Sequence, residues 1–334
     1  MAKIGVLGAG TWGMALARML CNSGHEVIVW SAIEKEIDDF SAERRHPNLP
    51  GMIIPDEITF TKDIGEAATG KDIVLFAVPS VFVRGTAAKA APYIPDRQVI
   101  VDVAKGIEPD TLMTLTEVIA DELNKDGAHG NVRLVALSGP THAEEVAKDI
   151  PTAIVSAGTD EEAAAFAQKV FTSSFMRVYT NDDVKGIELC GALKNIIALA
   201  AGMVGGMGYG DNTRAALITR GMAEMARLGS ALGAQASTFA GLAGIGDLIV
   251  TCTSVHSRNN RAGYLMGQGV GADEAVKEVG MVVEGINAIP AALALAKKTG
   301  VELPIIEGVD QVVSGGADPK QVLKNLMERQ PKPE

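Results

Sequence analysis

The sequence is poor in cysteine, in paired histidine and in positive charge, and each shortage excludes a class of protein. Only three cysteines occur among 334 residues, far apart and without C-x-x-C spacing, so we expect neither a disulfide framework nor a zinc site. The five histidines show no metal-ligand spacing, so no metal is expected. A formal net charge of −11 disfavours nucleic acid and anionic lipid as partners, because such binding depends on clustered lysine and arginine.

Long apolar runs and a secretory leader are also lacking. No apolar run has the length and continuity that a bilayer span requires, and the first apolar segment begins too early for a signal peptide. We therefore expect a cytoplasmic protein without membrane insertion. The length, the 47% hydrophobic content and the 37 glycines favour two folded domains over one domain or a disordered chain.

Glycine is abundant, and the first glycines of the chain form a motif. The apolar segment 4–7 runs into Gly8-Ala9-Gly10-Thr11-Trp12-Gly13, and helix-forming residues follow. Gly8 permits a tight turn, Gly10 lets the backbone approach a pyrophosphate, and Gly13 lets the helix pack closely on the strand. A second strand pattern at 25–30 supplies the context that the motif requires. The sequence therefore predicts a dinucleotide site here.

Strand and helix patterns alternate in the first part of the chain and give way to helices alone. The expected strands lie at 3–7, 25–30, 73–78, 98–103, 132–137, 152–156 and 177–179. Alanine-rich stretches predict helices at 187–203, 213–232, 285–298 and 319–327. We therefore predict an α/β protein: a Rossmann-type, doubly wound, mainly parallel sheet over 1–184 that binds dinucleotide, and an all-helical substrate and catalytic domain over 185–334.

Lys194 is the anomalous residue of the helical part. Between residues 187 and 204 only Glu188, Lys194 and Asn195 are strongly polar, and helical spacing puts Lys194 on a face of small and apolar residues. Burial of an unpaired ammonium is costly and lowers its pKa toward the range useful for proton transfer. The residues alone leave two interpretations: a general acid or base, and a lysine whose stem packs while its ammonium reaches water.

Two later segments carry polar groups that suit a small anionic substrate. Asp247 stands among glycines and apolar residues, as an N-cap or as the partner of a buried lysine or of a substrate hydroxyl. The run from Thr251 to Arg261 is rich in hydroxyls and ends in two arginines. Hydroxyls with a guanidinium suit a phosphate monoester, and a solvated, capped loop is the alternative.

Together these segments resemble the bacterial NAD(P)-dependent glycerol-3-phosphate dehydrogenase family. The resemblance runs from residue 3 to about residue 310, and its motifs are highly specific in combination. They are, in chain order, the glycine motif 8–13, Ala77-Val78-Pro79-Ser80, Lys105-Gly106, the segment 138–146, Gly191-Ala192-Leu193-Lys194-Asn195, the segments 211–221 and 244–248, Ser257-Arg258-Asn259 and Val282-Val283-Glu284-Gly285.

This resemblance implies an oxidoreductase that transfers hydride reversibly between NAD(P)H and dihydroxyacetone phosphate, giving sn-glycerol 3-phosphate for glycerophospholipid synthesis. Lys194 is implied as the proton donor and acceptor, which would neutralise the alkoxide developing at C2. The implied substrate-binding residues are Lys105, Gly139, Thr141, Lys194, Asp247, Ser257, Arg258 and Asn259. The cofactor-binding residues, including those of the glycine motif, are Gly8, Gly10, Thr11, Trp12, Gly13, Lys105, Ala143, Arg258, Val282 and Glu284. A homodimer is implied as well, without an interface that the sequence places.

The residues leave the choice between NAD and NADP open. After the second predicted strand the sequence is Trp30-Ser31-Ala32-Ile33-Glu34, whereas many family members carry a basic residue near Ala32. Without that cation a 2′-phosphate has less to bind, and without an immediate acidic residue a 2′-hydroxyl is not specially favoured. Arg44 and Arg45 lie further on, and the sequence does not place their side chains.

Two other functions compete with this interpretation. A 3-hydroxyacid dehydrogenase also joins a Rossmann domain to helices and uses a helical lysine, but its cation must face a carboxylate, and the Ser257-Arg258-Asn259 run argues against it. A cofactor-binding sensor without catalysis would give no reason to place Lys194 on an apolar face.

Overall fold

The computed structural model describes residues 1–331 and 333, and the chain divides into two compact units. Unit 1 contains Met1–Lys105 and Met113–Glu188, and unit 2 contains Gly106–Leu112 and Leu189–Glu334. The change of unit after Glu188 lies close to the expected boundary after residue 184. The segment Gly106–Leu112 differs from expectation, because Ile107 and Leu112 pack in the hydrophobic core of unit 2.

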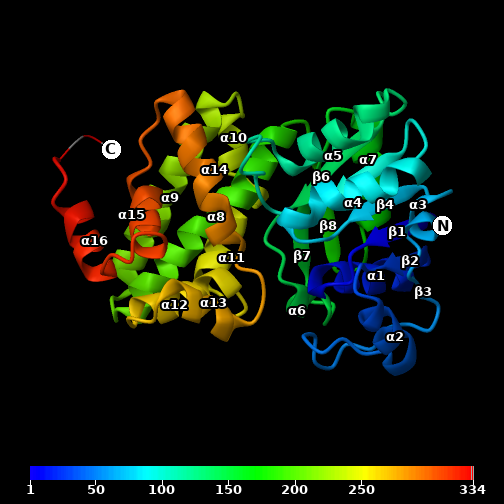
Figure 1. Ribbon diagram of the computed structural model, residues 1–334, viewed down its shortest axis with the longest axis horizontal. Helices are drawn as coiled ribbons and strands as arrows, with labels where there is room; N and C mark the ends of the chain where they lie inside the picture. Colours follow the sequence, from blue (N-terminus) through cyan, green and yellow to red (C-terminus); the bar gives the residue numbers. More distant parts are fainter. Residues whose placement is uncertain (332, 334) are drawn as a thin grey trace. The chain divides into compact units, whose positions relative to one another are not determined.

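Unit 1 is built on an eight-stranded sheet in the order β3-β2-β1-β4-β5-β6-β7-β8 (Figure 1). Every neighbouring pair is parallel except β6 and β7. The strands are β1 (Lys3–Leu7), β2 (Glu26–Trp30), β3 (Thr59–Thr61), β4 (Ile73–Phe76), β5 (Val99–Asp102), β6 (Arg133–Ser138), β7 (Thr152–Ala157) and β8 (Met176–Asn181). The Rossmann-type prediction is confirmed. Only β3 was not predicted, because a three-residue edge strand is too short to show a pattern.

Helices cover both faces of this sheet, which explains why β4 and β5 are buried throughout. One face packs against α1 (Thr11–Asn22), α2 (Glu34–Glu43), α6 (Ala143–Val146) and α7 (Glu161–Phe171). The other packs against α3 (Ile64–Ala68), α4 (Val83–Ala90) and α5 (Leu115–Leu123). Three short 3₁₀ turns complete the unit: η1 (Ser80–Phe82), η2 (Ala91–Tyr93) and η3 (Asn124–Asp126).

Unit 2 is helical, and the structure assigns no strand to its described residues. Its elements are the greater part of α8 (Val184–Gly206), then α9 (Asp211–Ala231), α10 (Ala236–Phe239), the π-helical turn η4 (Leu242–Gly246), α11 (Asp247–Thr253), α12 (Arg258–Gly267), α13 (Ala272–Val279), α14 (Glu284–Thr299), α15 (Pro304–Val313) and α16 (Pro319–Met327). α8 is the core helix, and α12 crosses it closely. A Cβ on Gly263 would lie 2.0 Å from the carbonyl oxygen of Leu199, so only glycine allows that approach.

The expectation that no stretch could span a bilayer needs a correction. By length and composition the stretches 184–206 and 236–253 are apolar enough to cross a membrane. The apolar window of α8 is wholly buried inside the protein, and the second stretch is kinked at Gly244 and carries the buried Asp247. A helix that is apolar on all sides is expected at the centre of a helical core, and that is the place of α8.

Glu188 fixes the start of α8 within unit 1. Its side chain is buried, and its carboxylate accepts hydrogen bonds from the backbone N–H (2.8 Å) and the hydroxyl of Thr116, in the first turn of α5. A carboxylate is stabilised at a helix N-terminus. Burial nevertheless raises the pKa of Glu188, and it raises the pKa of the neighbouring Asp102 well above its ordinary range. This contact anchors the helix that carries Lys194.

Glu224 of α9 is a second buried carboxyl group at a helix N-terminus. It accepts hydrogen bonds from the backbone N–H groups of Ile305 (2.8 Å) and Ile306 (3.3 Å) in the first turn of α15. Burial raises the pKa of Glu224 to about 7, although both hydrogen bonds oppose the rise. The native state therefore binds this proton more tightly than the unfolded chain does.

We expect Glu224 to make stability depend on pH. Because its folded pKa is raised, its contribution is fully present below the ordinary pKa of 4.5 and is lost as the pH rises through about 7. Denaturant unfolding should show a loss of up to about 3 kcal/mol between about pH 5 and about pH 8 from this group. Glu224→Gln should remove that loss, and Glu278→Gln, at an exposed position of α13, should keep it. An equal pH dependence in wild type and Glu224→Gln would contradict this assignment.

Candidate active site

The glycine motif of unit 1 forms an open cradle between β1 and α1. Gly8 has φ +124°, and a Cβ there would lie 2.7 Å from the backbone of Ala77. A Cβ on Gly13 would lie 2.2 Å from the carbonyl oxygen of Gly8, whereas one on Gly10 would meet nothing within 4 Å. Two glycines are thus required by close packing, and the third leaves room in front of the α1 N-terminus. This arrangement fits a dinucleotide pyrophosphate.

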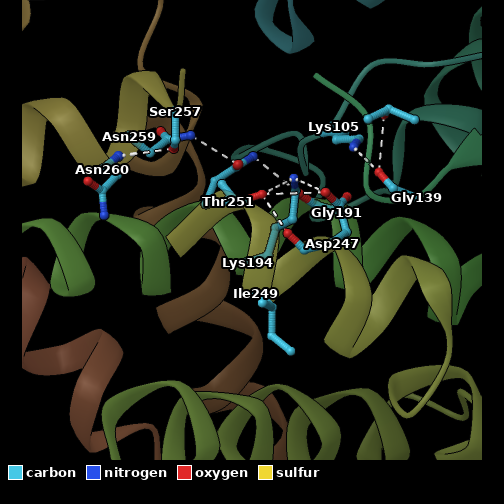
Figure 2. Close-up of polar contacts among 12 residues, drawn as sticks. Lys105, Gly139, Gly191, Lys194, Asp247, Ile249, Thr251, Ser257, Asn259 and Asn260 are labelled. Carbon is cyan, nitrogen blue, oxygen red and sulfur yellow. Dashed lines mark hydrogen bonds and ion pairs between the residues drawn. The ribbon is translucent and has the colours of Figure 1, made fainter. Parts of the chain in front are cut away.

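The next predicted site residues of unit 1 follow the carboxyl ends of β5 and β6. Lys105 Nζ donates a hydrogen bond to the carbonyl oxygen of Gly139 (3.3 Å), as Figure 2 shows. The Thr141 hydroxyl donates to the same oxygen (3.1 Å), and Ala143 begins α6. Thr11 and Trp12 lie half-buried in the first turn of α1. Unit 1 therefore brings Lys105, Gly139 and Thr141 together at the edge where ligands of open parallel sheets bind.

Lys194 is the centre of the polar cluster in unit 2. Its ammonium donates hydrogen bonds to Asp247 Oδ1 (2.6 Å) and to Thr251 Oγ1 (2.7 Å), as Figure 2 shows. Lys194 is 5% exposed and Asp247 is 1% exposed. The structure thus excludes the interpretation of a lysine that reaches bulk water. It also pairs Asp247 with the lysine, which was one of the two interpretations of that carboxylate.

The shape of the chain before α11 explains how Asp247 reaches Lys194. The π-helical turn η4 is kinked at Gly244, whose φ and ψ of −86° and −105° are not helical. A Cβ on Gly244 would lie 2.1 Å from the carbonyl oxygen of Phe239, so a larger residue would push the turn outward. Asp247 is the first residue of α11, and Thr251 follows one helical turn later on the same face.

Thr251 is a partner of Lys194 that the sequence analysis did not single out. Its hydroxyl belongs to the run for which the sequence left a phosphate site and a solvated, capped loop as alternatives. In the structure it receives a hydrogen bond from Lys194 and donates one to the carbonyl oxygen of Asp247 (2.6 Å). Both partners of Lys194 are thereby held on one helix. The i, i+4 spacing from Asp247 was the available signal, and it is visible only once a helix is assumed to begin at Asp247.

Cys252 lies beside this cluster without taking part in proton transfer. It is buried, and burial raises the pKa of its thiol to about 12 despite the nearby positive charge of Lys194. The thiol is therefore neutral at physiological pH, and thiolate chemistry is excluded at this position. None of the three cysteines forms a disulfide.

The Ser257-Arg258-Asn259 run forms the start of α12, where its side chains have different tasks. Ser257 is the N-cap, and its hydroxyl accepts a hydrogen bond from the backbone N–H of Asn260 (3.2 Å). Asn259 is buried and bonded within the protein. Arg258 is half-buried, and among residues 1–331 and 333 no hydrogen bond or ion pair engages its guanidinium. Arg258 is the cation of this run that stays available for a ligand.

Asn259 connects the neighbour of Lys194 to the start of α14. Its Nδ2 donates to Asn195 Oδ1 (3.0 Å), and its Oδ1 accepts from the backbone N–H of Gly285 (2.8 Å). Glu284, the first residue of α14, accepts from Asn287 Nδ2 (3.3 Å), and Val282 lies half-buried in the preceding turn. Asn259 therefore joins α8 to the backbone at the start of α14, next to the predicted cofactor residue Glu284.

The predicted site residues fall into two groups, one in each unit. Unit 1 holds the glycine motif, Lys105, Gly139, Thr141 and Ala143, and unit 2 holds Lys194, Asp247, Ser257, Arg258, Asn259, Val282 and Glu284. Within the described part of the chain, no group of three His, Cys, Asp or Glu side chains is arranged to hold a metal ion. The groups that could act on a ligand are therefore the ammonium of Lys194, the guanidinium of Arg258 and the glycine motif, which could bind a dinucleotide.

Comparison with known proteins agrees with these features over almost the whole chain. Residues 3–164 match the family model described as NAD-dependent glycerol-3-phosphate dehydrogenase N-terminus, and residues 183–324 match the corresponding C-terminus model. The chain is 69% identical over 334 residues to glycerol-3-phosphate dehydrogenase (NAD(P)+) 2 of Lactobacillus delbrueckii subsp. bulgaricus, covering 100% of this chain and 99% of that protein.

Further relatives and a solved structure show the same similarity. The glycerol-3-phosphate dehydrogenase (NAD(P)+) of Agathobacter rectalis is 51% identical over 330 residues, which cover 98% of this chain and 96% of that protein. The crystal structure of glycerol-3-phosphate dehydrogenase from Coxiella burnetii has a TM-score of 0.93 at 37% identity and covers 98% of this chain and 99% of that one.

Proposed function

This chain belongs to the NAD-dependent glycerol-3-phosphate dehydrogenase family, and on that premise we propose that Lys194, Asp247 and Thr251 carry out its proton transfer while Arg258 holds the substrate phosphate. The enzyme is an NAD(P)-dependent oxidoreductase that interconverts dihydroxyacetone phosphate and sn-glycerol 3-phosphate. The observation that carries the proposed roles is the buried Lys194–Asp247–Thr251 cluster.

Lys194 acts as the general acid in the reduction of the ketone. A nicotinamide held by the glycine motif would supply the hydride for C2. The Lys194 ammonium gives a proton to the C2 oxygen, so no free alkoxide develops. In the reverse direction the neutral amine takes the hydroxyl proton. An ammonium held in a site that excludes water stabilises developing negative charge far better than water does.

Asp247 and Thr251 keep the Lys194 ammonium in place for this transfer. Their oxygens lie 2.6 Å and 2.7 Å from Nζ, and these two hydrogen bonds fix the position of the ammonium. The carboxylate compensates the buried positive charge, whose burial would otherwise be costly. Asp247 and Thr251 thus act on the reaction through the position of Lys194.

Different residues bind the substrate phosphate and the dinucleotide. Arg258 suits the phosphate because a half-buried guanidinium can bind two phosphate oxygens at once. The glycine motif with Thr11, Trp12 and Ala143 holds the dinucleotide, and Lys105 with Gly139 and Thr141 borders it at the same sheet edge. Ser257, Asn259, Val282 and Glu284 complete the sites that the family resemblance implies.

We also propose a cytoplasmic homodimer whose product enters glycerophospholipid synthesis. The support is the family resemblance, together with three cysteines that form no disulfide. Light scattering on the purified protein tests the dimer: a mass near 70 kDa is expected, about twice the 34.8 kDa chain. A mass near that of one chain would contradict it.

The direct test of function is the oxidation of NADH and NADPH on addition of dihydroxyacetone phosphate. Unphosphorylated dihydroxyacetone should react poorly, because it offers nothing for Arg258 to bind. 3-Hydroxyisobutyrate with NAD+ tests the hydroxyacid alternative and should give no turnover. Oxidation of the reduced cofactor by both ketones at equal rates would overturn the phosphate assignment.

A narrower prediction concerns Thr251. Thr251→Val keeps the shape of the side chain but removes the oxygen that receives a hydrogen bond from Lys194, so kcat should fall about tenfold with little change in KM. Thr253 lies on the same helix, but it is exposed and bonds only its own helix backbone through Ile249. Thr253→Val should leave kcat unchanged. Equal kcat values for the two variants would remove Thr251 from the proposed cluster.

A further inference from the structure

The end of β2 lies directly beside the dinucleotide cradle. The backbone N–H of Gly8 donates to the carbonyl oxygen of Trp30 (2.9 Å), and Ser31 follows Trp30 in the chain. In a Rossmann sheet this position faces the adenosine ribose of the dinucleotide. An acidic residue there binds the 2′-hydroxyl, and a basic residue there accommodates a 2′-phosphate.

The structure brings a carboxylate to this position from the next helix. The hydroxyl of Ser31 donates to Glu36 Oε2 (2.7 Å) and accepts from the backbone N–H of Ile33 (3.1 Å). Ser31 is 6% exposed, so both hydrogen bonds are shielded and the carboxylate of Glu36 is held at the end of β2. The sequence alone does not indicate the contact between Ser31 and Glu36, because Glu36 lies beyond the positions that directly follow the strand.

His46 supports the same arrangement from the loop after α2. Its ring stacks on Phe40 with centroids 5.1 Å apart, contacts the backbone of Ala9 in the glycine motif and lies within reach of the Glu36 charge. Burial lowers the pKa of His46 in spite of that charge. At physiological pH the ring is therefore neutral, and it adds no positive charge beside Glu36.

Arg44, one of the two arginines after α2, is bonded to backbone carbonyl groups of unit 1. Arg44 donates from Nη1 to the carbonyl oxygens of Pro55 (3.2 Å) and Ile58 (2.8 Å), and its guanidinium lies 5.4 Å over the ring of Phe60. Arg45 is exposed, in a loop beyond α2.

The helix that carries Glu36 is itself strongly acidic. α2 has the sequence EKEIDDFSAE, with five carboxylates and one lysine. That lysine, Lys35, pairs with Asp39 (2.6 Å), and Lys62 pairs with Asp38 (2.8 Å). The ribose end of the cradle therefore faces negative charge, which favours a ribose hydroxyl over a phosphate dianion.

We propose that Glu36, held by Ser31, is the residue that determines cofactor choice and that this enzyme uses NAD(H) in preference to NADP(H). One carboxylate oxygen of Glu36 is bonded to Ser31, and the other accepts a hydrogen bond from the ribose. A 2′-phosphate at the same place meets the carboxylate charge, and the guanidinium of Arg44 is bonded to the carbonyl oxygens of Pro55 and Ile58. The proposal rests on dinucleotide binding by unit 1 and is independent of the roles given to Lys194 and Arg258.

Equilibrium binding tests the proposal without turnover. Dissociation constants of NADH and NADPH should differ by about 10- to 100-fold in favour of NADH. The fragments 5′-AMP and adenosine 2′,5′-bisphosphate, used as competitors of NADH, should show the same order. If NADPH and the bisphosphate bind as well as or better than NADH and 5′-AMP, the proposal is overturned. If neither dinucleotide binds, the cradle itself is misassigned, and both the proposal and the cofactor site are lost.

Three variants locate the effect on Glu36. Glu36→Gln removes the charge but keeps the size of the side chain. It should lower the ratio of the NADPH dissociation constant to the NADH dissociation constant about tenfold. Ser31→Ala removes the hydroxyl that bonds Glu36 but keeps the Glu36 carboxylate, and it should lower the same ratio of dissociation constants about threefold. Asp39→Asn makes the same change of charge on the same helix and should leave the ratio within about twofold of wild type. An unchanged ratio in Glu36→Gln, or an equal change in Asp39→Asn, would overturn the role of Glu36.

Discussion

Replacing Lys194 with alanine should lower kcat by about 10³- to 10⁴-fold and leave NADH binding nearly unchanged. The ammonium is bonded to Asp247 and Thr251 in unit 2, whereas the glycine motif proposed to bind the dinucleotide belongs to unit 1. The loss is therefore expected in the chemical step, where the proton must reach the C2 oxygen. Steady-state kinetics together with NADH titration of the same preparation separates the two effects.

The Lys194→Ala result needs a control for folding, because the variant leaves Asp247 buried without its cation. Small primary alkylammonium ions can occupy the space of the missing side chain and should restore part of kcat. Lys185→Ala, on the same helix at a position that pairs with Glu117 near the surface, should behave as wild type. A kcat close to wild type for Lys194→Ala would remove the lysine from the acid–base role.

Replacing Arg258 with alanine should raise the KM for dihydroxyacetone phosphate about 100-fold, with a smaller effect on kcat. Its guanidinium is half-buried at the start of α12, and no described residue engages it in a hydrogen bond or an ion pair. The side chain therefore has no structural partner to lose, and the loss falls on the substrate phosphate. Initial rates over a range of substrate concentrations measure it.

Two comparisons make the Arg258 prediction specific. Arg261→Ala, one turn later and exposed, removes the same charge and should change KM less than threefold. Unphosphorylated dihydroxyacetone should be reduced at the same low rate by wild type and Arg258→Ala, because neither can use a phosphate contact. Equal KM values for Arg258→Ala and wild type would place the phosphate at another cation.

Local pattern was enough to predict most of the fold. Seven of the eight strands and the helical nature of unit 2 follow from short apolar runs, glycine turns and alanine-rich periodicity, all of which depend on near neighbours in the chain. The exceptions are instructive. β3 is a three-residue edge strand, and Gly106–Leu112 joins unit 2 because of packing with distant residues, which no local pattern records.

For the site, the kinds of residue were predictable and their partners were not. The position of Lys194 on an apolar helix face marked it as special, but whether its ammonium is paired depended on Asp247, which is distant in sequence and reaches it through the kink at Gly244. Thr251 was not singled out as a partner of Lys194 for the same reason. A hydroxyl has no signature of its own until its neighbours in space are known.

The sequence by itself indicated the glycine motif, the division into sheet and helices, and Lys194 and Arg258 as candidates for the chemistry, because these depend on residue type and on spacing along the chain. Tertiary structure alone decided that Lys194 is buried and paired, that Asn259 bonds within the protein and that Arg44 bonds the carbonyl oxygens of Pro55 and Ile58. It also brought Glu36 to Ser31 at the end of β2. Each of these contacts depends on how the backbone turns between elements, and hydrogen-bond partners at that range leave no periodic trace in the sequence.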